Sequence, residues 1–124
     1  MTTPARILIV DDDEHYLLGM REWLEAAGYE ATTVKTVADG RRAILNAAPH
    51  LVILDVRLGS ANGLQLISTG ALTVPVIVVT GHDDPVLRAD TTAFGARYLV
   101  KPVDPHALLA IIEEHLTSTE SARN

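Results

Sequence analysis

Side chains that could do chemistry follow four short apolar runs of this 124-residue chain. Asp11 and Asp12 follow the first run, Asp55 the second, Thr80 the third and Lys101 the fourth. Two carboxylates about 4 Å apart repel each other by roughly 4 kcal/mol at an effective dielectric constant of about 20. A hard divalent cation with oxygen ligands would neutralise such a group. Mg²⁺ is the expected ion, and Mn²⁺ is the alternative.

A hydroxyl and an ammonium beside these acids suit a phosphoryl ligand. Its oxygens would be shared among the cation, Thr80 and Lys101. Asp55 follows the run that is expected to form the central strand, and a carboxylate can accept a phosphoryl group as an acyl phosphate. The residue types therefore predict a phosphoacceptor with Asp55 as its nucleophile.

These side chains meet only if the apolar runs are neighbouring strands. Short, continuously apolar runs are typical of strands that are covered on both faces of a parallel sheet. The pattern predicts five strands at 7–10, 30–34, 51–54, 76–79 and 97–100. Helices are expected between and after them, at 14–27, about 36–47, 64–69, 85–94 and 105–116. This alternation predicts an α/β fold with a doubly wound, five-stranded parallel sheet and five helices, whose strands all end at one edge.

Composition limits the classes of protein to which the chain can belong. The length suits a single domain over 1–124, with a core at about 5–116, and the polar residues 117–124 are expected to be a disordered tail with no output domain after them. No apolar run is long enough to cross a bilayer, and no signal peptide or cysteine is present, which favours a cytoplasmic protein without membrane contact. The net charge of −6 and scattered basic residues argue against direct binding of nucleic acid.

In their order along the chain, the four motifs resemble the receiver domain of response regulators in two-component signalling, in its free-standing single-domain form. The segments that carry the resemblance are 7–12, 52–58 with Gly63, 76–81 and 95–102. The resemblance implies a flavodoxin-like sheet with strand order 2-1-3-4-5. It also implies a switch protein of a phosphorelay rather than an enzyme with an external substrate, one that catalyses at most its own phosphorylation and dephosphorylation.

By the same resemblance, Asp55 would be phosphorylated in a magnesium-dependent reaction. Asp11, Asp12 and Asp55 would hold Mg²⁺ together with the backbone carbonyl of Arg57. The phosphoryl donor would be a histidine kinase or a histidine phosphotransfer protein. The signal would pass through protein contacts to an unknown downstream target, and a homodimer through the 85–116 face is a further expectation.

The resemblance also assigns roles to residues on the last two strands. Thr80 and Lys101 would contact the phosphoryl group, and Tyr98 would act with Thr80 in the switch. The Lys101–Pro102 peptide bond is expected to be cis, which X-Pro bonds adopt at low cost. His82, two residues after Thr80, and Arg57, two residues after Asp55, would influence the lifetime of the phosphoryl group.

Two features depart from the family pattern. Gly59 stands where receivers often carry a proline, so the loop over the site is expected to be looser. The segment 63–75 is about one helical turn shorter than is common in the family and contains Gly70. The third helix, and any partner surface that it would offer, are therefore expected to differ from the family pattern.

Several residues have structural explanations that compete with functional ones. Asp12 or Asp13 could cap the first helix, because Asp is favoured there. Leu17 and Leu18 cannot both face the core, and an exposed Leu18 would be a candidate docking contact for a kinase or phosphotransfer helix. Trp23 is expected to pack. The five histidines His15, His50, His82, His106 and His115 are expected to face solvent, and only His82 is a candidate for a functional role.

Three other functions remain open. An aspartyl-phosphate hydrolase of the haloacid dehalogenase kind would use Asp11 and Asp13, but His15 does not fit its motif and the chain is too short for a cap domain. A receiver fold could also act as a scaffold without phosphorylation, which the acidic residues argue against. A flavodoxin-like electron carrier would meet repulsion between its FMN phosphate and the acidic triplet.

Overall fold

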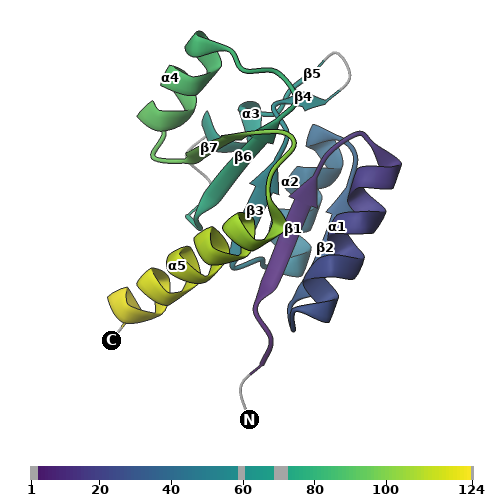
Figure 1. Ribbon diagram of the computed structural model, residues 1–124, viewed down its shortest axis with the longest axis vertical. Coiled ribbons are helices and arrows are strands. Elements are labelled where there is room, and N and C mark those ends of the chain that lie inside the picture. The colour runs from purple at the N-terminus through teal and green to yellow at the C-terminus, as the bar shows by residue number, and fades with distance from the viewer. Residues whose placement is uncertain (1–2, 59–60, 69–72, 124) are drawn as a thin grey trace.

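The protein, seen here in a computed structural model, is built on a five-stranded parallel sheet (Figure 1). The structure describes residues 3–58, 61–68 and 73–123. The sheet order is β2-β1-β3-β6-β7. Its strands are β1 (Arg6–Val10), β2 (Glu30–Val34), β3 (Leu51–Leu54), β6 (Val76–Thr80) and β7 (Arg97–Val100). This is the expected doubly wound architecture with the expected order, because the labels β4 and β5 belong to a separate small pair.

The helices cover both faces of the sheet (Figure 1). Helices α1 (Glu14–Ala26) and α5 (Pro105–Arg123) pack on one face, where Leu24 and Ile112 join a core with the odd-numbered residues of β1 and β3. The other face carries α2 (Val37–Ala47), α3 (Gln65–Ser68) and α4 (Pro85–Ala93). The central strands are buried on both faces, which explains why they read as continuous apolar runs.

Polar caps start the helices where the sequence predicts them. The Asp13 side chain accepts hydrogen bonds from the backbone N–H groups of the first turn of α1, and Asp84 does the same for α4. Thr36 caps α2 through the N–H of Asp39, at 3.0 Å. Gly28 follows α1 with a φ of +98°, a backbone conformation that glycine adopts without strain.

The structure differs from the expectations in two segments. The segment after β3 contains a short antiparallel pair, β4 (Arg57–Leu58) with β5 (Ala61–Asn62), where only a turn was expected. The prediction of a disordered tail from residue 117 is wrong, because α5 continues to Arg123. Low apolar content made the tail look disordered, but no glycine or proline in 117–123 ends the helix.

The third helix is short, as the sequence indicates. It spans Gln65–Ser68 against the expected 64–69, and Leu66 and Leu64 hold it to the core. The predictions for Gly59 and Gly70 lie outside the described residues. Within the described part of the chain, no helix is long and apolar enough to cross a membrane.

Candidate functional site

Strand register brings the predicted site residues to one edge of the sheet. Val10 pairs with Leu54, so the next residues, Asp11 and Asp55, leave the sheet side by side. The backbone N–H of Asp55 donates to the carbonyl of Val10 at 2.9 Å, which continues the ladder to the acid itself. Parallel pairing alone therefore places two acids that are 44 residues apart at one point.

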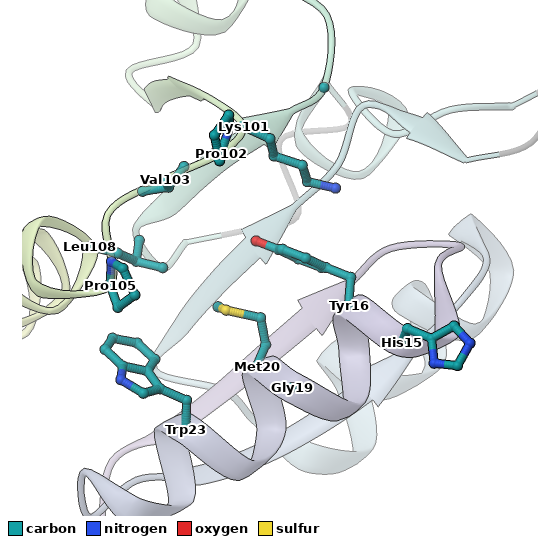
Figure 2. Close-up of a pocket in the computed structure, with 11 residues that line it drawn as sticks. His15, Tyr16, Gly19, Met20, Trp23, Lys101, Pro102, Val103, Pro105 and Leu108 are labelled. Atoms are coloured by element: carbon teal, nitrogen blue, oxygen red, sulfur yellow. The ribbon is translucent and has the colours of Figure 1, made fainter.

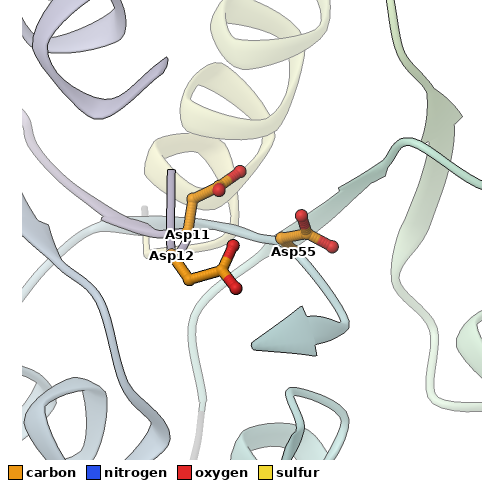
Figure 3. A group of neighbouring side chains, drawn as sticks. All are labelled: Asp11, Asp12 and Asp55. Carbon is orange, nitrogen blue, oxygen red and sulfur yellow. The ribbon is translucent and has the colours of Figure 1, made fainter. Parts of the chain in front are cut away.

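Three carboxylates form a cluster at this edge (Figure 3). One oxygen from each of Asp11, Asp12 and Asp55 lies within 4.8 Å of the others. Asp11 and Asp55 are buried, with 2% and 8% of their surfaces exposed, whereas Asp12 is exposed. Hard oxygen donors at this spacing, partly open to solvent, fit a Mg²⁺ ion that keeps several of its waters.

The buried carboxylates divide their oxygens between backbone donors and one ammonium. Oδ1 of Asp11 accepts from the N–H of Asp13 at 2.9 Å, and Oδ1 of Asp55 accepts from the N–H of Arg57 at 3.0 Å. The Nζ of Lys101 lies 2.7 Å from Oδ2 of Asp11 and 3.4 Å from Oδ2 of Asp55. One lysine therefore bridges both acids.

Burial and charge oppose each other at this cluster. Burial raises the pKa of the Asp55 carboxyl, and the charge of Asp11 adds to the rise, so that together they outweigh the lowering by the Arg57 N–H and by Lys101. Burial would lower the pKa of Lys101, but its hydrogen bond to Asp11 and the charges of both acids raise it. The ammonium is thus held in its charged form, while Asp55 carries its charge at a cost.

The acidic cluster opens into a cavity of about 310 Å³. The cavity is lined by Asp11, Asp12, Asp13, Asp55, Arg57, Thr80, Gly81, His82 and Lys101. It therefore contains every residue that the sequence placed at the metal and phosphoryl positions. The Thr80 side chain is fully buried, and its Oγ1 accepts from the N–H of His82 at 3.3 Å.

Tyr98 lies on β7 outside that cavity and points inward, with 9% of its surface exposed. Its hydroxyl donates to the carbonyl of His82 at 3.1 Å and accepts from the N–H of Asp84 at 3.1 Å. The guanidinium of Arg88 on α4 lies 4.6 Å from the ring centroid. Tyr98 therefore connects the loop after Thr80 to the face of β7, at the position expected of a switch residue.

Two backbone features shape the segments around the acids. The Lys101–Pro102 peptide bond is cis, as the resemblance implies. At Gly63, a methyl group would overlap the backbone carbonyl oxygen of Asp55. Only glycine fits this close approach, so Gly63 supports the backbone from which Asp55 projects.

The structure decides between the competing explanations for α1. Asp13 is the helix cap and Asp12 belongs to the acid cluster. Leu17 is buried and Leu18 is 57% exposed, so only the first faces the core. Trp23 packs against the core on the α1 and α5 side, as expected.

The histidines divide into two groups. Solvent exposure is confirmed for His15, His82 and His106, but it is wrong for His50 and His115, which are half-buried. Nδ1 of His50 accepts from the backbone N–H of Arg6 at 2.9 Å, so this histidine joins two strand ends.

Sequence reasoning missed one residue beside the site. The ring of Tyr16, in the first turn of α1, lies 4.0 Å from the Lys101 Nζ, measured to the ring centroid. The signal was available, because Asp13 as helix cap places Tyr16 three residues later in the first turn. Recognising it required knowing that the first turn of α1 lies next to the Lys101 side chain.

The comparisons with known proteins all point to response regulators and their receiver domains. The family described as "Response regulator receiver domain" matches residues 7–113. Transcriptional regulatory protein GlrR of Escherichia coli is 36% identical over 125 residues, and transcriptional regulatory protein FixJ of Bradyrhizobium diazoefficiens is 31% identical over 130 residues. These alignments cover 96% and 98% of this chain, but only 28% of GlrR and 62% of FixJ.

Solved structures agree with the sequence relatives. The crystal structure of a CheY-like response regulator receiver domain protein from Methanospirillum hungatei JF-1 has a TM-score of 0.90 at 32% identity, and the alignment covers 97% of this chain and 99% of that one. The signal receiver domain of a putative Luxo repressor protein from Vibrio parahaemolyticus has a TM-score of 0.88 at 25% identity, over 98% and 96% of the two chains.

Proposed function

This chain belongs to the response regulator receiver domain family, and from that premise we propose that it is a phosphoacceptor switch phosphorylated on Asp55. The observation that carries the proposal is the position of Asp55. Its carboxylate lies in a cavity with two further acids, a buried threonine hydroxyl and a lysine ammonium. The family makes a histidine kinase or a histidine phosphotransfer protein the expected donor.

The proposed reaction uses groups at the sheet edge and a phosphohistidine donor, and it takes place in the presence of Mg²⁺. A carboxylate oxygen of Asp55 attacks the phosphorus, a new P–O bond forms, and the P–N bond to the donor imidazole breaks. The imidazole leaves with the electron pair of that bond. Lys101 and Thr80 would bind the transferred phosphoryl oxygens, as an ammonium and a hydroxyl donor.

The donor set fits magnesium. Asp11, Asp12 and Asp55 would hold the ion, with the Arg57 carbonyl as the proposed fourth protein ligand. A bound Mg²⁺ would offset the repulsion among the carboxylates and the incoming phosphoryl oxygens. Mn²⁺, with the same ligand preference, would be expected to substitute.

We propose that the signal leaves the site through Thr80 and Tyr98. A phosphoryl group on Asp55 would draw the Thr80 hydroxyl, whose oxygen now accepts from the His82 N–H. The loop after Thr80 carries the carbonyl of His82 and the N–H of Asp84, which are the hydrogen-bond partners of the Tyr98 hydroxyl. A shift of this loop would thus reach the surface made by α4, β7 and α5, where we place the contacts with a downstream protein or a second copy.

Arg57 and His82 both line the cavity, and they are the proposed tuners of phosphoryl lifetime. The chain is proposed to act in the cytoplasm and to catalyse at most its own phosphorylation and dephosphorylation. The direct binding of nucleic acid is not part of the proposal. GlrR and FixJ are named as transcriptional regulatory proteins, and that role belongs to those longer proteins.

The test is incubation of the full chain with acetyl phosphate and Mg²⁺, followed by intact-mass measurement. The native chain should gain one phosphoryl group, and Asp55→Asn should gain none. Asp90→Asn, which changes an exposed acid on α4 away from the cavity, is the matched control and should gain the group like the native chain.

The same experiment separates the alternatives. A native chain that gains no phosphoryl group would favour a scaffold without phosphorylation. Turnover of a phosphate ester by the Asp55→Asn variant would favour a hydrolase that uses Asp11. Transfer to Asp55→Asn at the native level would place the acceptor elsewhere.

A further inference from the structure

Tyr16 lines a second, mainly apolar groove (Figure 2), which shares Gly81 and Lys101 with the acidic cavity. The groove has a volume of about 710 Å³ and lies between α1 and the start of α5. Met20 and Trp23 follow Tyr16 along α1, and Pro105 and Leu108 face them. Lys101 lines both the groove and the acidic cavity, so its side chain runs along the boundary between them.

The Lys101 ammonium is held from three sides. Oδ2 of Asp11 lies at 2.7 Å and Oδ2 of Asp55 at 3.4 Å, and the centroid of the Tyr16 ring is 4.0 Å away. A lysine has a flexible four-carbon stem and a point charge that accepts many geometries. An aromatic face attracts this charge without competing for its hydrogen bonds, and it blocks the direction toward the groove.

Tyr16 itself is well fixed. It is half-buried, and its backbone N–H donates to the capping carboxylate of Asp13 at 3.2 Å. Leu17, the next residue on the helix, is buried in the core. The ring is therefore carried by a rigid helical turn, whereas the lysine that it contacts lies in the segment after β7.

We infer that Tyr16 is a positioning residue for phosphoryl transfer, because its ring holds the Lys101 ammonium against Asp11 and Asp55, where the phosphoryl oxygens arrive. The inference rests on the proposed function of Asp55. The role belongs to the ring face and not to the hydroxyl. Tyr16→Phe keeps that face, and Tyr16→Leu removes it at similar bulk.

The first experiment measures the rate at which the full chain gains a phosphoryl group from acetyl phosphate at saturating Mg²⁺. In this reaction Asp55 forms a P–O bond, the P–O bond to acetate breaks, and acetate leaves with the electron pair. Tyr16→Leu should lower the rate about fivefold, the size expected for a partly buried cation–π contact, and Tyr16→Phe should restore the native rate. Leu45→Ala, a change at an exposed leucine of α2 that lines neither the groove nor the acidic cavity, is the control and should keep the native rate.

A double-mutant cycle separates positioning from general damage to the fold. If Tyr16 acts through the ammonium, Tyr16→Leu should not slow the reaction further in a Lys101→Ala background. An equal slowing in both backgrounds would overturn the inference. So would a native rate for Tyr16→Leu, or a rate for Tyr16→Phe as low as that of Tyr16→Leu.

A measurement without phosphate makes the two proposals independently testable. The ε-methylene protons of Lys101 should show an upfield ring-current shift in NMR spectra of the native chain and of Tyr16→Phe, and the shift should be lost in Tyr16→Leu. Absence of this shift in the native chain would overturn the contact itself. If the shift is present but native Asp55 gains no phosphoryl group, the proposed function fails, and the positioning role fails with it.

Discussion

Burial of Asp55 disfavours the charged form of its carboxyl group. The carboxyl is 8% exposed, and its pKa is raised by burial and by the charge of Asp11, despite the N–H of Arg57 and the ammonium of Lys101. A carboxylate whose charged form is destabilised by burial is stabilised when it binds a cation or becomes an acyl phosphate. Asp55 thus lines the cavity, and the destabilisation of its charged form favours its reaction there.

Replacing Asp55 by Asn should stabilise the metal-free protein. The variant removes the raised-pKa carboxyl, so we expect the free energy of unfolding at neutral pH to increase by about 1 kcal/mol in urea titrations with EDTA. The native carboxyl binds its proton more tightly in the folded than in the unfolded chain. Native stability should therefore fall, relative to the variant, as pH rises from below the unfolded pKa through the folded pKa, and the difference should then stay constant.

The Asp90→Asn variant is again the control, because this exposed acid lies outside the cavity. It should change stability by no more than about 0.5 kcal/mol. A loss of stability in Asp55→Asn at neutral pH would mean that the contact with Lys101 outweighs burial.

Gly63 lies against the backbone of Asp55, where a larger residue does not fit. In Gly63→Ala the added methyl group would overlap the backbone carbonyl of Asp55, so we expect a loss of roughly 1 to 3 kcal/mol in the free energy of unfolding, together with slower phosphorylation. Gly19→Ala is the matched control. No atom lies within 4 Å of its added methyl, and within α1 it should stabilise the protein by up to about 1 kcal/mol.

At the scale of elements, the three consecutive acids Asp11, Asp12 and Asp13 are divided between the cap of α1 and the acid cluster. Asp13 caps the helix through the N–H groups of His15 and Tyr16, at 3.0 and 3.2 Å. Asp12 points into the acid cluster with Asp11 and Asp55. Neighbouring residues of the same type therefore serve stability and ligand binding separately.

This division predicts opposite results for two alanine variants. Asp13→Ala should lower the free energy of unfolding in EDTA by about 1 kcal/mol, as expected for the loss of a helix cap. Asp12→Ala keeps the cap of α1 and should instead weaken Mg²⁺ binding, measured by calorimetry. Similar effects of the two variants on both quantities would contradict the division.

The whole molecule should respond to magnesium as a folded-state ligand. The strand ends bring the three carboxylates together only in the folded chain, so a bound ion stabilises that state by about 2.7 kcal/mol at a free concentration of about 100 times its Kd. We expect Tm in thermal scans to rise with added Mg²⁺, and this rise to be smaller in Asp55→Asn. Lys101→Ala should increase the response, because its ammonium no longer repels the ion. A Tm that does not change with Mg²⁺ would argue against the metal site.

The sequence by itself determined the architecture and the membership of the site. Buried strands on both faces read as apolar runs, and parallel strands end at one edge, so Asp11, Asp55, Thr80 and Lys101 had to converge. Family resemblance then supplied the roles that residue types alone leave open.

Only the tertiary structure decided what depends on contacts between distant elements. The sequence shows equivalent acids at 11–13, but the register and the start of α1 make Asp13 a cap and Asp12 part of the acid cluster. Helix α5 continues where composition predicted a tail, because composition does not specify where a helix without glycine or proline stops. The contact of Tyr16 with Lys101 joins residues 85 positions apart, and only the folded arrangement brings the start of α1 to the segment after β7.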